Sequence, residues 1–296
     1  MLLLPARSAI RRMLAQGVPA NLATPLNYLA WPIISSDAQR ILNPIDRSRA
    51  AMAKRTDDPP FGFDSPRPQQ VEDGQIPTVG PTKVSPWTWL ATHSSVTLYW
   101  GTFLYLCAKH TRAQTILELG GCAGISACYL SSGNSGNQLI TVEGSPGRAA
   151  VAEANLRAIN PSARVVNVMF DDALDEWLPK LSGKLDLVHI DGQHNRVSTL
   201  HYFERVKPHL RRGALVIFDD IHWSDDMRRA WNELSKSRGL SHSIDVGRYG
   251  ICVLADTSQQ EPRVYNFSRY AMEWRDQNEP RLGRPHPEAP YESSRG

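Results

Sequence analysis

The sequence predicts an α/β fold in which a doubly wound sheet of seven strands ends in an antiparallel hairpin. Short apolar runs alternate with helical segments between residues 86 and 256. The run 185–190 is nearly all apolar, as a parallel strand covered on both faces should be. Gly247 and Arg248 separate the last two apolar runs in the manner of a tight hairpin turn. Strands and helices that alternate in this way form a parallel sheet with helices on both faces.

The expected strands are apolar and bounded by turn residues, and they span 115–119, 138–143, 164–169, 185–190, 214–218, 242–246 and 249–254. The expected helices show apolar residues at helical spacing or a capping residue at their start. They span 98–106, 125–130, 146–160, 172–178, 198–206 and a segment after Ser224 in which Met227, Ala230, Trp231 and Leu234 share one face.

The chain divides into three parts. Residues 1–85 are proline-rich and are expected to be an irregular extension that could contact substrate or a second subunit, as in a homo-oligomer. Residues 86–256 carry the regular alternation. Residues 257–296 are polar, and their end is expected to be disordered. No apolar run approaches the ~20 residues of a membrane span, and a net charge of +3 is too small to indicate a nucleic-acid partner.

The N-terminus has its own charge pattern. Residues 1–36 contain no acid, and Arg7, Arg11 and Arg12 interrupt a short apolar sequence. This basic amphipathic pattern could be a transit-like segment or a helix on a membrane surface. The alternative is a helix that docks on the protein's own body or on a second subunit. We favour the alternative because Pro19 and Pro25 keep the helix short.

The cysteines predict a reducing environment. Cys107, Cys122, Cys128 and Cys252 show neither a CxxC motif nor the spacing of zinc ligands. Reduced thiols in a cytoplasmic protein are therefore expected.

The segment 116–126 is an apolar strand that ends in an acid and runs through a glycine-bearing turn into a helix. A buried strand that delivers its carboxyl end to a helix N-terminus is typical of nucleotide sites. Gly120 and Gly124 are expected where a side chain would block the backbone's approach to the ligand. The NAD fingerprint G-x-G-x-x-G does not fit, because Gly121 follows Gly120 directly and Glu118 precedes both.

This turn resembles motif I of the class I S-adenosylmethionine-dependent methyltransferases, E/D-x-G-x-G-x-G, with Cys122 at the middle glycine. The form E-x-G-x-x-x-G-x-S is similar to the metal-dependent O-methyltransferases related to catechol and caffeoyl-CoA methyltransferases. The resemblance covers about residues 90–256. It implies a Rossmann-like methyltransferase sheet and a turn that binds S-adenosylmethionine through Glu118, Gly120, Gly121, Gly124 and Ser126.

Two later segments extend the predicted cofactor site. Glu143 ends the second strand, where an acid can accept both ribose hydroxyls of a nucleoside, and Gly144 and Ser145 follow it. NAD enzymes use an acid in the same way, so Glu143 alone does not discriminate. Asp171 and Asp172 resemble the family's adenine-binding segment, although Asp172 could instead cap the next helix.

Acidic residues end two later strands. Asp191 ends the fourth strand, and Asp219 and Asp220 end the fifth. Three converging carboxylates repel one another unless a cation lies among them, and oxygen ligands suit Mg²⁺, Ca²⁺ or Mn²⁺. The resemblance implies that Asp191, Asp219 and Asp220 hold a divalent metal, most often Mg²⁺, with Asp191 also near the cofactor. Alternatively, these acids hold the cofactor or orient a base without a metal.

Three histidines lie near these acids. His194 occupies the position at which the catechol branch has a lysine that takes the substrate proton, and an imidazole can do the same. His222 could also reach the rim as a base. His189 shares a strand face with Asp191 and is expected to be a packed residue.

The sequence therefore predicts an S-adenosylmethionine-dependent O-methyltransferase that uses a divalent metal and acts on a small molecule. A metal-independent N- or C-methyltransferase on the same fold stays open, as do an NAD-linked oxidoreductase and a non-catalytic cofactor-binding partner. The sequence does not identify the methyl acceptor.

Overall fold

The computed structural model describes residues 3–60, 85–257 and 260–278. Its strands are β1 (Thr115–Leu119), β2 (Gln138–Val142), β3 (Arg164–Val166), β4 (Leu185–Ile190), β5 (Leu210–Phe218), β6 (Leu240–Asp245), β7 (Gly250–Leu254) and β8 (Arg263–Asn266). Its α-helices are α1 (Leu3–Ala15), α2 (Ala23–Ala30), α3 (Ser36–Met52), α4 (Pro86–Thr92), α5 (Leu98–Thr111), α6 (Ile125–Ser131), α7 (Pro146–Arg157), α8 (Phe170–Leu181), α9 (Arg196–Val206), α10 (Asp225–Leu234) and α11 (Met272–Asn278). Short 3-10 helices span Ala20–Leu22, Lys207–His209 and Ser268–Tyr270.

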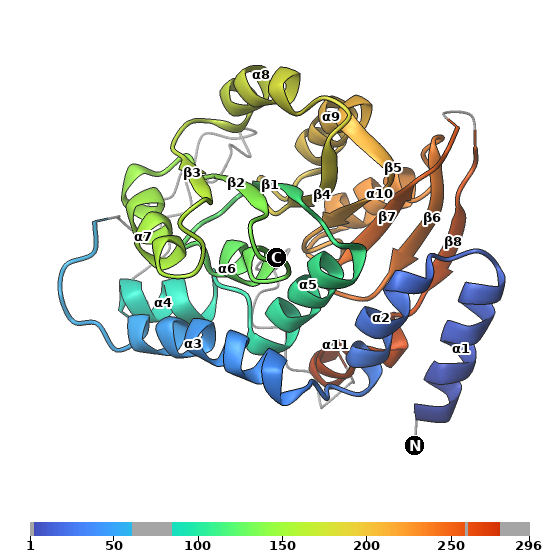
Figure 1. The fold of residues 1–296 in the computed structure, drawn as a ribbon, viewed down its shortest axis with the longest axis horizontal. Helices are drawn as coiled ribbons and strands as arrows, with labels where there is room; N and C mark the ends of the chain where they lie inside the picture. Colours follow the sequence, from blue (N-terminus) through green and yellow to red (C-terminus); the bar gives the residue numbers. More distant parts are fainter. Residues whose placement is uncertain (1–2, 61–84, 258–259, 279–296) are drawn as a thin grey trace, which may run out of the picture.

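One sheet runs through the molecule in the order β3-β2-β1-β4-β5-β7-β6-β8 (Figure 1). Strands β1 to β5 are mutually parallel, and β7 is antiparallel to both β5 and β6. The doubly wound architecture and the antiparallel hairpin are confirmed. The predicted count of seven strands is one too low, because β8 pairs in parallel with the edge of β6.

Helices cover both faces of the sheet (Figure 1). Helices α5, α6 and α7 cover one face, with α1 to α4 outside or beside them, and α8, α9 and α10 cover the other. Each face has its own apolar core. The first includes the buried side chains of Ile116 and Leu187, and the second includes those of Leu117 and Val188. This alternation explains why parallel strands in the centre are apolar at nearly every position.

The regular part largely follows the predicted elements. The bounds of β1 and β4 are confirmed, and Ser224 caps α10 by accepting a hydrogen bond from the backbone N–H of Met227. The third strand is shorter than predicted, since β3 stops at Val166 and α8 already begins at Phe170. The predicted capping role of Asp172 is wrong, because Met169 occupies the N-cap and makes no side-chain cap bond.

The prediction that residues 1–85 are irregular is wrong for the described part. Residues 3–52 form mainly helices, and Ala6, Ile10 and Met13 of α1 are buried in the first core. The prediction of a helix docked on the protein's own body is confirmed. The prolines of this part do not exclude helices, and Pro44 even lies inside α3. The prolines at 66, 68 and 81 lie outside the described residues.

The C-terminal part is also more regular than predicted. Residues 263–266 form β8, and α11 packs beside α2 (Figure 1). The expected disordered end, roughly the last fifteen residues, lies outside the described residues, which stop at 278.

Two further expectations concern the whole chain. Within the described ranges, none of the helices combines the length and apolar character that crossing a bilayer requires. All four cysteines are free, as predicted. The cytoplasmic location that they suggested stays a prediction.

Candidate functional site

The turn between β1 and α6 is built for close packing. Gly120 has a φ of +101°, and a Cβ there would lie 1.7 Å from the carbonyl oxygen of Asp191. Gly124 has a φ of +75°, and its Cβ would lie 2.9 Å from the backbone of Ala152 on α7. The sequence led us to assign these glycines to ligand approach. The structure gives another reason for glycine at both positions. The backbone there is left-handed, and a Cβ would collide with neighbouring backbone atoms of the protein itself.

Glu118 lies in a buried polar network beneath this turn. Its Oε2 accepts a hydrogen bond of 2.6 Å from the Thr141 hydroxyl, and its Oε1 lies 3.0 Å from Nδ1 of His189. All three residues are fully buried. Because a carboxylate only accepts, Nδ1 of His189 carries the proton of this hydrogen bond, and in the neutral ring Nε2 keeps a lone pair. That Nε2 is buried and has no hydrogen-bond partner among the described residues.

Glu143 is fixed at the mouth of the turn. Its carboxylate accepts a hydrogen bond of 2.9 Å from the N–H of Cys122 and one of 2.8 Å from the N–H of Ser145. The side chain therefore stays at the carboxyl end of β2 with lone pairs to spare. Gly144 lies between Glu143 and the N-cap residue of α7, Ser145, whose side chain makes no cap bond.

The other predicted cofactor residues differ in setting. Ser126 is buried in the first turn of α6. Asp171 lies on α8, and its carboxylate bonds with His201 and Arg205 of α9. These ion pairs account for Asp171 as a surface residue that ties two helices together. Asp172 is exposed in the first turn of α8.

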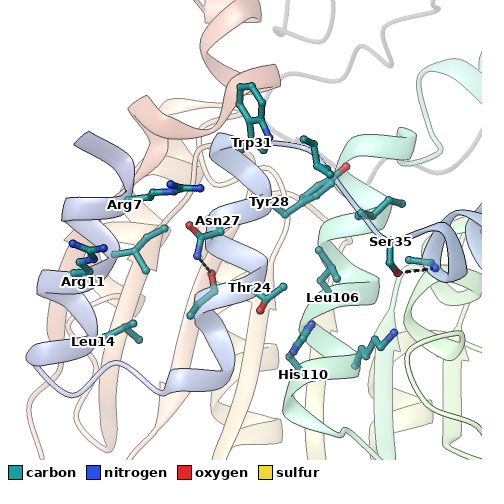
Figure 2. A pocket seen from close by; sticks show the side chains of 16 residues that line it. Arg7, Arg11, Leu14, Thr24, Asn27, Tyr28, Trp31, Ser35, Leu106 and His110 are labelled. Carbon is teal, nitrogen blue, oxygen red and sulfur yellow. Dashed lines mark hydrogen bonds between the residues drawn. The ribbon is translucent and has the colours of Figure 1, made fainter. Parts of the chain in front are cut away.

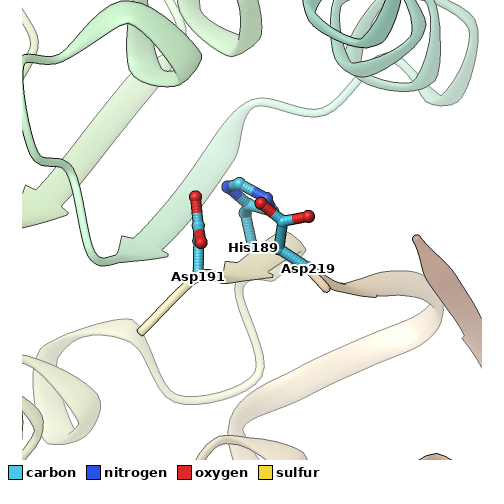
Figure 3. A group of neighbouring side chains, drawn as sticks. All are labelled: His189, Asp191 and Asp219. Carbon is cyan, nitrogen blue, oxygen red and sulfur yellow. The ribbon is translucent and has the colours of Figure 1, made fainter. Parts of the chain in front are cut away.

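The carboxyl ends of β4 and β5 bring three ligand-type side chains together. Single atoms of His189, Asp191 and Asp219 lie within 4.8 Å of one another, and Figure 3 shows the three side chains facing one another. Asp220 is outside this group. Its Oδ2 lies 4.0 Å from Nε2 of His194. The ligand set suggested by the sequence contained Asp220 and left out His189.

Arg248, from the turn between β6 and β7, already forms an ion pair with one of these acids, Asp219. Its Nε and Nη2 each donate a hydrogen bond of 2.8 Å to Asp219, one to each carboxylate oxygen. Its guanidinium also lies 3.7 Å from Asp220. Paired, parallel bonds of this kind are among the strongest polar contacts in proteins. One positive charge is therefore part of the acid cluster.

Burial and neighbouring charge separate the two central acids. Burial, followed by the charges of Asp219 and Asp220, raises the pKa of Asp191 well above its ordinary value. Burial alone would also raise the pKa of Asp219, but the charge and hydrogen bonds of Arg248 lower it below the ordinary value. Asp191 is thus the carboxyl for which a further cation or a proton is most favourable.

The two candidate bases are held in different ways. Nε2 of His194 lies 3.5 Å from Asp191, and the side chain is partly exposed above the cluster. Nε2 of His222 lies 2.9 Å from Asp245, and its ring contacts Trp274 of α11. His222 is therefore directed toward the C-terminal segment, whereas His194 faces the acids.

Strained backbone gathers at the same edge of the sheet. Cys122, Gln193, His194 and Asp220 all have a positive φ without being glycine, and they follow the ends of β1, β4 and β5. Among the described non-glycine residues, only Arg112 shares this conformation elsewhere, and it caps α5. Strained backbone of this kind clusters at active and ligand-binding sites.

Comparison with known proteins finds a family likeness that spans this edge of the sheet. A family model described as "Methyltransferase domain" matches residues 117–221, which include the glycine turn and the acids of β4 and β5. The match covers 105 of the chain's 296 residues, and over them the chain is similar to a methyltransferase domain. A candidate O-methyltransferase from Klebsiella pneumoniae matches with a TM-score of 0.50 and 19% identity, over 77% of this chain and 95% of that one. At that identity the likeness supports the Rossmann-like methyltransferase fold alone.

Two curated relatives match part of this chain. A catechol O-methyltransferase from Mycobacterium tuberculosis is 35% identical over 123 residues, which cover 41% of this chain and 54% of that protein. A catechol O-methyltransferase from Niastella koreensis is 33% identical over 126 residues, 41% of this chain and 55% of that protein. The chain therefore spans about half the length of the curated relatives it matches.

Sequence reasoning missed three residues at or beside the candidate site. His189 was assigned to packing, although its proton on Nδ1 frees Nε2 for the cluster. Arg248 was seen only as part of a turn. Arg148 of α7 contributes a buried Nε that has no hydrogen-bond partner among the described residues, close to Cys122 and its neighbour Glu143. An arginine in the first turn of the helix, two residues after Pro146, was the available signal for the last of these.

Proposed function

We propose that the protein is an S-adenosylmethionine-dependent O-methyltransferase that acts on a small-molecule hydroxyl. The match of residues 117–221 to a methyltransferase domain carries the proposal, because it spans both the cofactor turn and the acid cluster. The two curated relatives, both named catechol O-methyltransferase, support oxygen as the acceptor atom.

The residues around the turn suit the cofactor. Glu143 is fixed by two backbone N–H groups and keeps acceptor capacity for ribose hydroxyls. The unpartnered Nε of Arg148 offers a buried donor to an anionic group. When bound, S-adenosylmethionine supplies a methyl group already activated on a sulfonium. Residues proposed to hold it are Gly120, Gly121, Gly124, Ser126, Glu143, Gly144, Ser145, Arg148, Asp172 and Asp191.

Glu118 is proposed to act indirectly, by positioning other parts of the site. Its two oxygens are engaged by Thr141 and His189 inside the protein. It therefore positions His189 and the turn, and it does not need to touch the ligand.

The acid cluster also suits a divalent cation. His189 presents an unpartnered Nε2 that Glu118 orients from behind, which is the arrangement usual for a metal-bound imidazole. Asp191 and Asp219 lie within reach of the same point. A bound cation would lower the pKa of a coordinated hydroxyl. A nitrogen ligand favours Mn²⁺ over Mg²⁺ more than an all-oxygen set does.

His194 is the proposed base. Its Nε2 faces Asp191 and Asp220 at 3.5 and 4.0 Å, so two carboxylates stabilise the imidazolium that forms when it accepts the acceptor's hydroxyl proton. The partly exposed ring can pass that proton to water. His222 is the weaker candidate because Asp245 engages its Nε2.

The first experiment separates cofactors. Isothermal titration with S-adenosylmethionine and with NAD should show binding of the first alone. Tight binding of NAD without S-adenosylmethionine would overturn the proposal. A panel of catechols, other phenols and hydroxy acids, assayed for release of adenosylhomocysteine with Mg²⁺ or Mn²⁺ present, then identifies the acceptor class.

A matched pair of variants tests the cation site. Asp191→Asn should abolish the rise in melting temperature that Mn²⁺ gives the wild type, whereas Asp220→Asn should retain it. The reverse result would restore Asp220 to the ligand set. An unchanged response in both variants would remove the assignment altogether. Titration with S-adenosylmethionine shows whether each variant keeps its cofactor site.

The Asp219–Arg248 pair favours a second candidate, methyl transfer without a metal. Arg248 already supplies a positive charge where the family resemblance implies a cation. Dialysis against EDTA decides between the two. Activity that survives EDTA and is not increased by Mg²⁺ or Mn²⁺ would support the metal-independent enzyme.

A further inference from the structure

The N-terminal helices form a groove at a distance from the acid cluster. It has a volume of about 700 Å³ and is lined by α1, α2, α5 and the segment after α2. Figure 2 shows that α2 runs through its middle, with Arg7, Arg11 and Leu14 on one side and Leu106 and His110 on the other. The groove is therefore an open, ridged surface and not a single enclosed chamber.

The charge on this surface has one sign. Arg7, Arg11 and Lys109 line it, and none of the described lining residues is acidic. Neither arginine has an acidic partner among the described residues, and both are exposed. His110 adds no charge at neutral pH, because burial, followed by the charge of Lys109, lowers its pKa. An unpaired set of cations attracts an anionic partner.

Large apolar side chains are exposed at one end of the groove. Leu4 is 77% exposed, Trp31 52% and Ile33 66%. Helices α1 and α2 lie side by side and run in opposite directions (Figure 1), so the start of α1 is beside the end of α2. Leu4 is three and seven residues before Arg7 and Arg11, and so shares their face of α1. The exposed apolar side chains and the arginines therefore belong to one surface.

The apolar face of α1 is not the contact surface. Ala6, Ile10 and Met13 are buried in the core of the protein. The exposed face must therefore engage its partner through the arginines and through the tip formed by Leu4, Trp31 and Ile33. Tryptophan beside basic residues suits the boundary between lipid headgroups and acyl chains.

We propose that this surface docks on a lipid bilayer that carries anionic phospholipid. The partner's negative headgroups match Arg7 and Arg11, with the half-buried Lys109 adding to the positive charge, and its interfacial zone accepts Trp31 and Ile33. Since few apolar side chains are exposed, binding depends on charge and weakens as salt screens it.

The test is co-sedimentation of the full chain with vesicles. Vesicles of phosphatidylcholine with one quarter phosphatidylglycerol should bind the protein in ~0.1 M salt and release it in ~0.5 M salt, as screening predicts. Vesicles of phosphatidylcholine alone should bind it at least tenfold more weakly. Equal binding to both vesicle types would overturn the proposal.

Substitutions in the groove test whether this surface makes the contact with the bilayer. Each arginine near an anionic bilayer contributes about fivefold to binding, so Arg7→Glu with Arg11→Glu should lower it more than twentyfold. Trp31→Ser should also lower it. The control pair, Lys54→Glu with Arg212→Glu, reverses two exposed charges outside the groove and should bind like the wild type.

Two further readouts keep the result clear. Far-UV circular dichroism and titration with S-adenosylmethionine show that each variant is folded. Light scattering after gel filtration reports the oligomeric state. If the wild type fails to bind anionic vesicles and Arg7→Glu with Arg11→Glu separates a dimer, the surface joins two copies of the chain and the membrane proposal is wrong.

Discussion

Arg248 and Asp219 form a two-point ion pair, with donor–acceptor distances of 2.8 Å at both carboxylate oxygens. They come from the turn after β6 and from the end of β5, and both are largely buried. A cation built into the protein thus neutralises one acid of a cluster in which Asp191 remains uncompensated. The charge balance of the cluster favours one more cation, and Arg248 would compete with it for Asp219.

Arg248→Met tests this competition. The variant leaves Asp219 buried without its partner, so the free energy of unfolding should fall by about 3–5 kcal/mol. A divalent ion should then replace the lost charge, and Mn²⁺ should raise the melting temperature of the variant more than that of the wild type. Urea denaturation and thermal melts with and without Mn²⁺ provide the measurements. A smaller response than the wild type's would mean that Arg248 does not compete with a metal.

The hydroxyl of Thr141 donates a hydrogen bond to the buried Glu118 beneath the turn between β1 and α6. Thr141→Val keeps the side chain's shape but leaves Oε2 of Glu118 without a donor. The free energy of unfolding should fall by about 1–3 kcal/mol, the cost of an unsatisfied buried group. Thr141→Ser retains the hydroxyl, so its free energy of unfolding should fall much less. Urea denaturation of both variants checks the prediction, and equal losses would show that packing, not the hydrogen bond, is responsible.

Gly120 and Gly136 offer a matched comparison of two left-handed glycines. An alanine at Gly120 would place its Cβ 1.7 Å from backbone, whereas a Cβ at Gly136 would meet nothing within 4 Å. Gly136→Ala should therefore cost about 1–2 kcal/mol from backbone strain alone. Gly120→Ala should cost more than about 4 kcal/mol or prevent folding. Thermal melts decide the matter, and similar melting temperatures would contradict the packing role of Gly120.

Local sequence signals predicted the central sheet well. The bounds of β1 and β4 followed from apolar runs between turn residues, and the residues of α10 that were predicted to share one face are all buried. The strand β8 gave no such signal, because Arg263–Asn266 is a short edge strand of four mostly exposed residues. Pairing with β6, which depends on tertiary structure, makes it a strand.

Contacts distant in sequence limited the prediction of the site. The glycine turn, Glu143 and the acids at 191 and 219 could be found because strand ends and spacing determine where they lie. The role of His189 depends on Glu118, which lies 71 residues earlier in the chain. Arg248 meets Asp219 across 29 residues. Neither pairing has a local pattern, so one sequence could not reveal them.

Ile10 tests whether the N-terminal helices are an integral part of the fold. Its side chain is 3% exposed and belongs to the same core as Ile116 of β1. Ile10→Ala should therefore lower the free energy of unfolding by about 2–5 kcal/mol, while Arg12→Ala on the exposed side of α1 should change it by less than about 0.5 kcal/mol. Urea denaturation followed by circular dichroism should show a single transition for both variants. A loss for Ile10→Ala as small as that for Arg12→Ala would mean that α1 is only loosely attached to the rest of the fold.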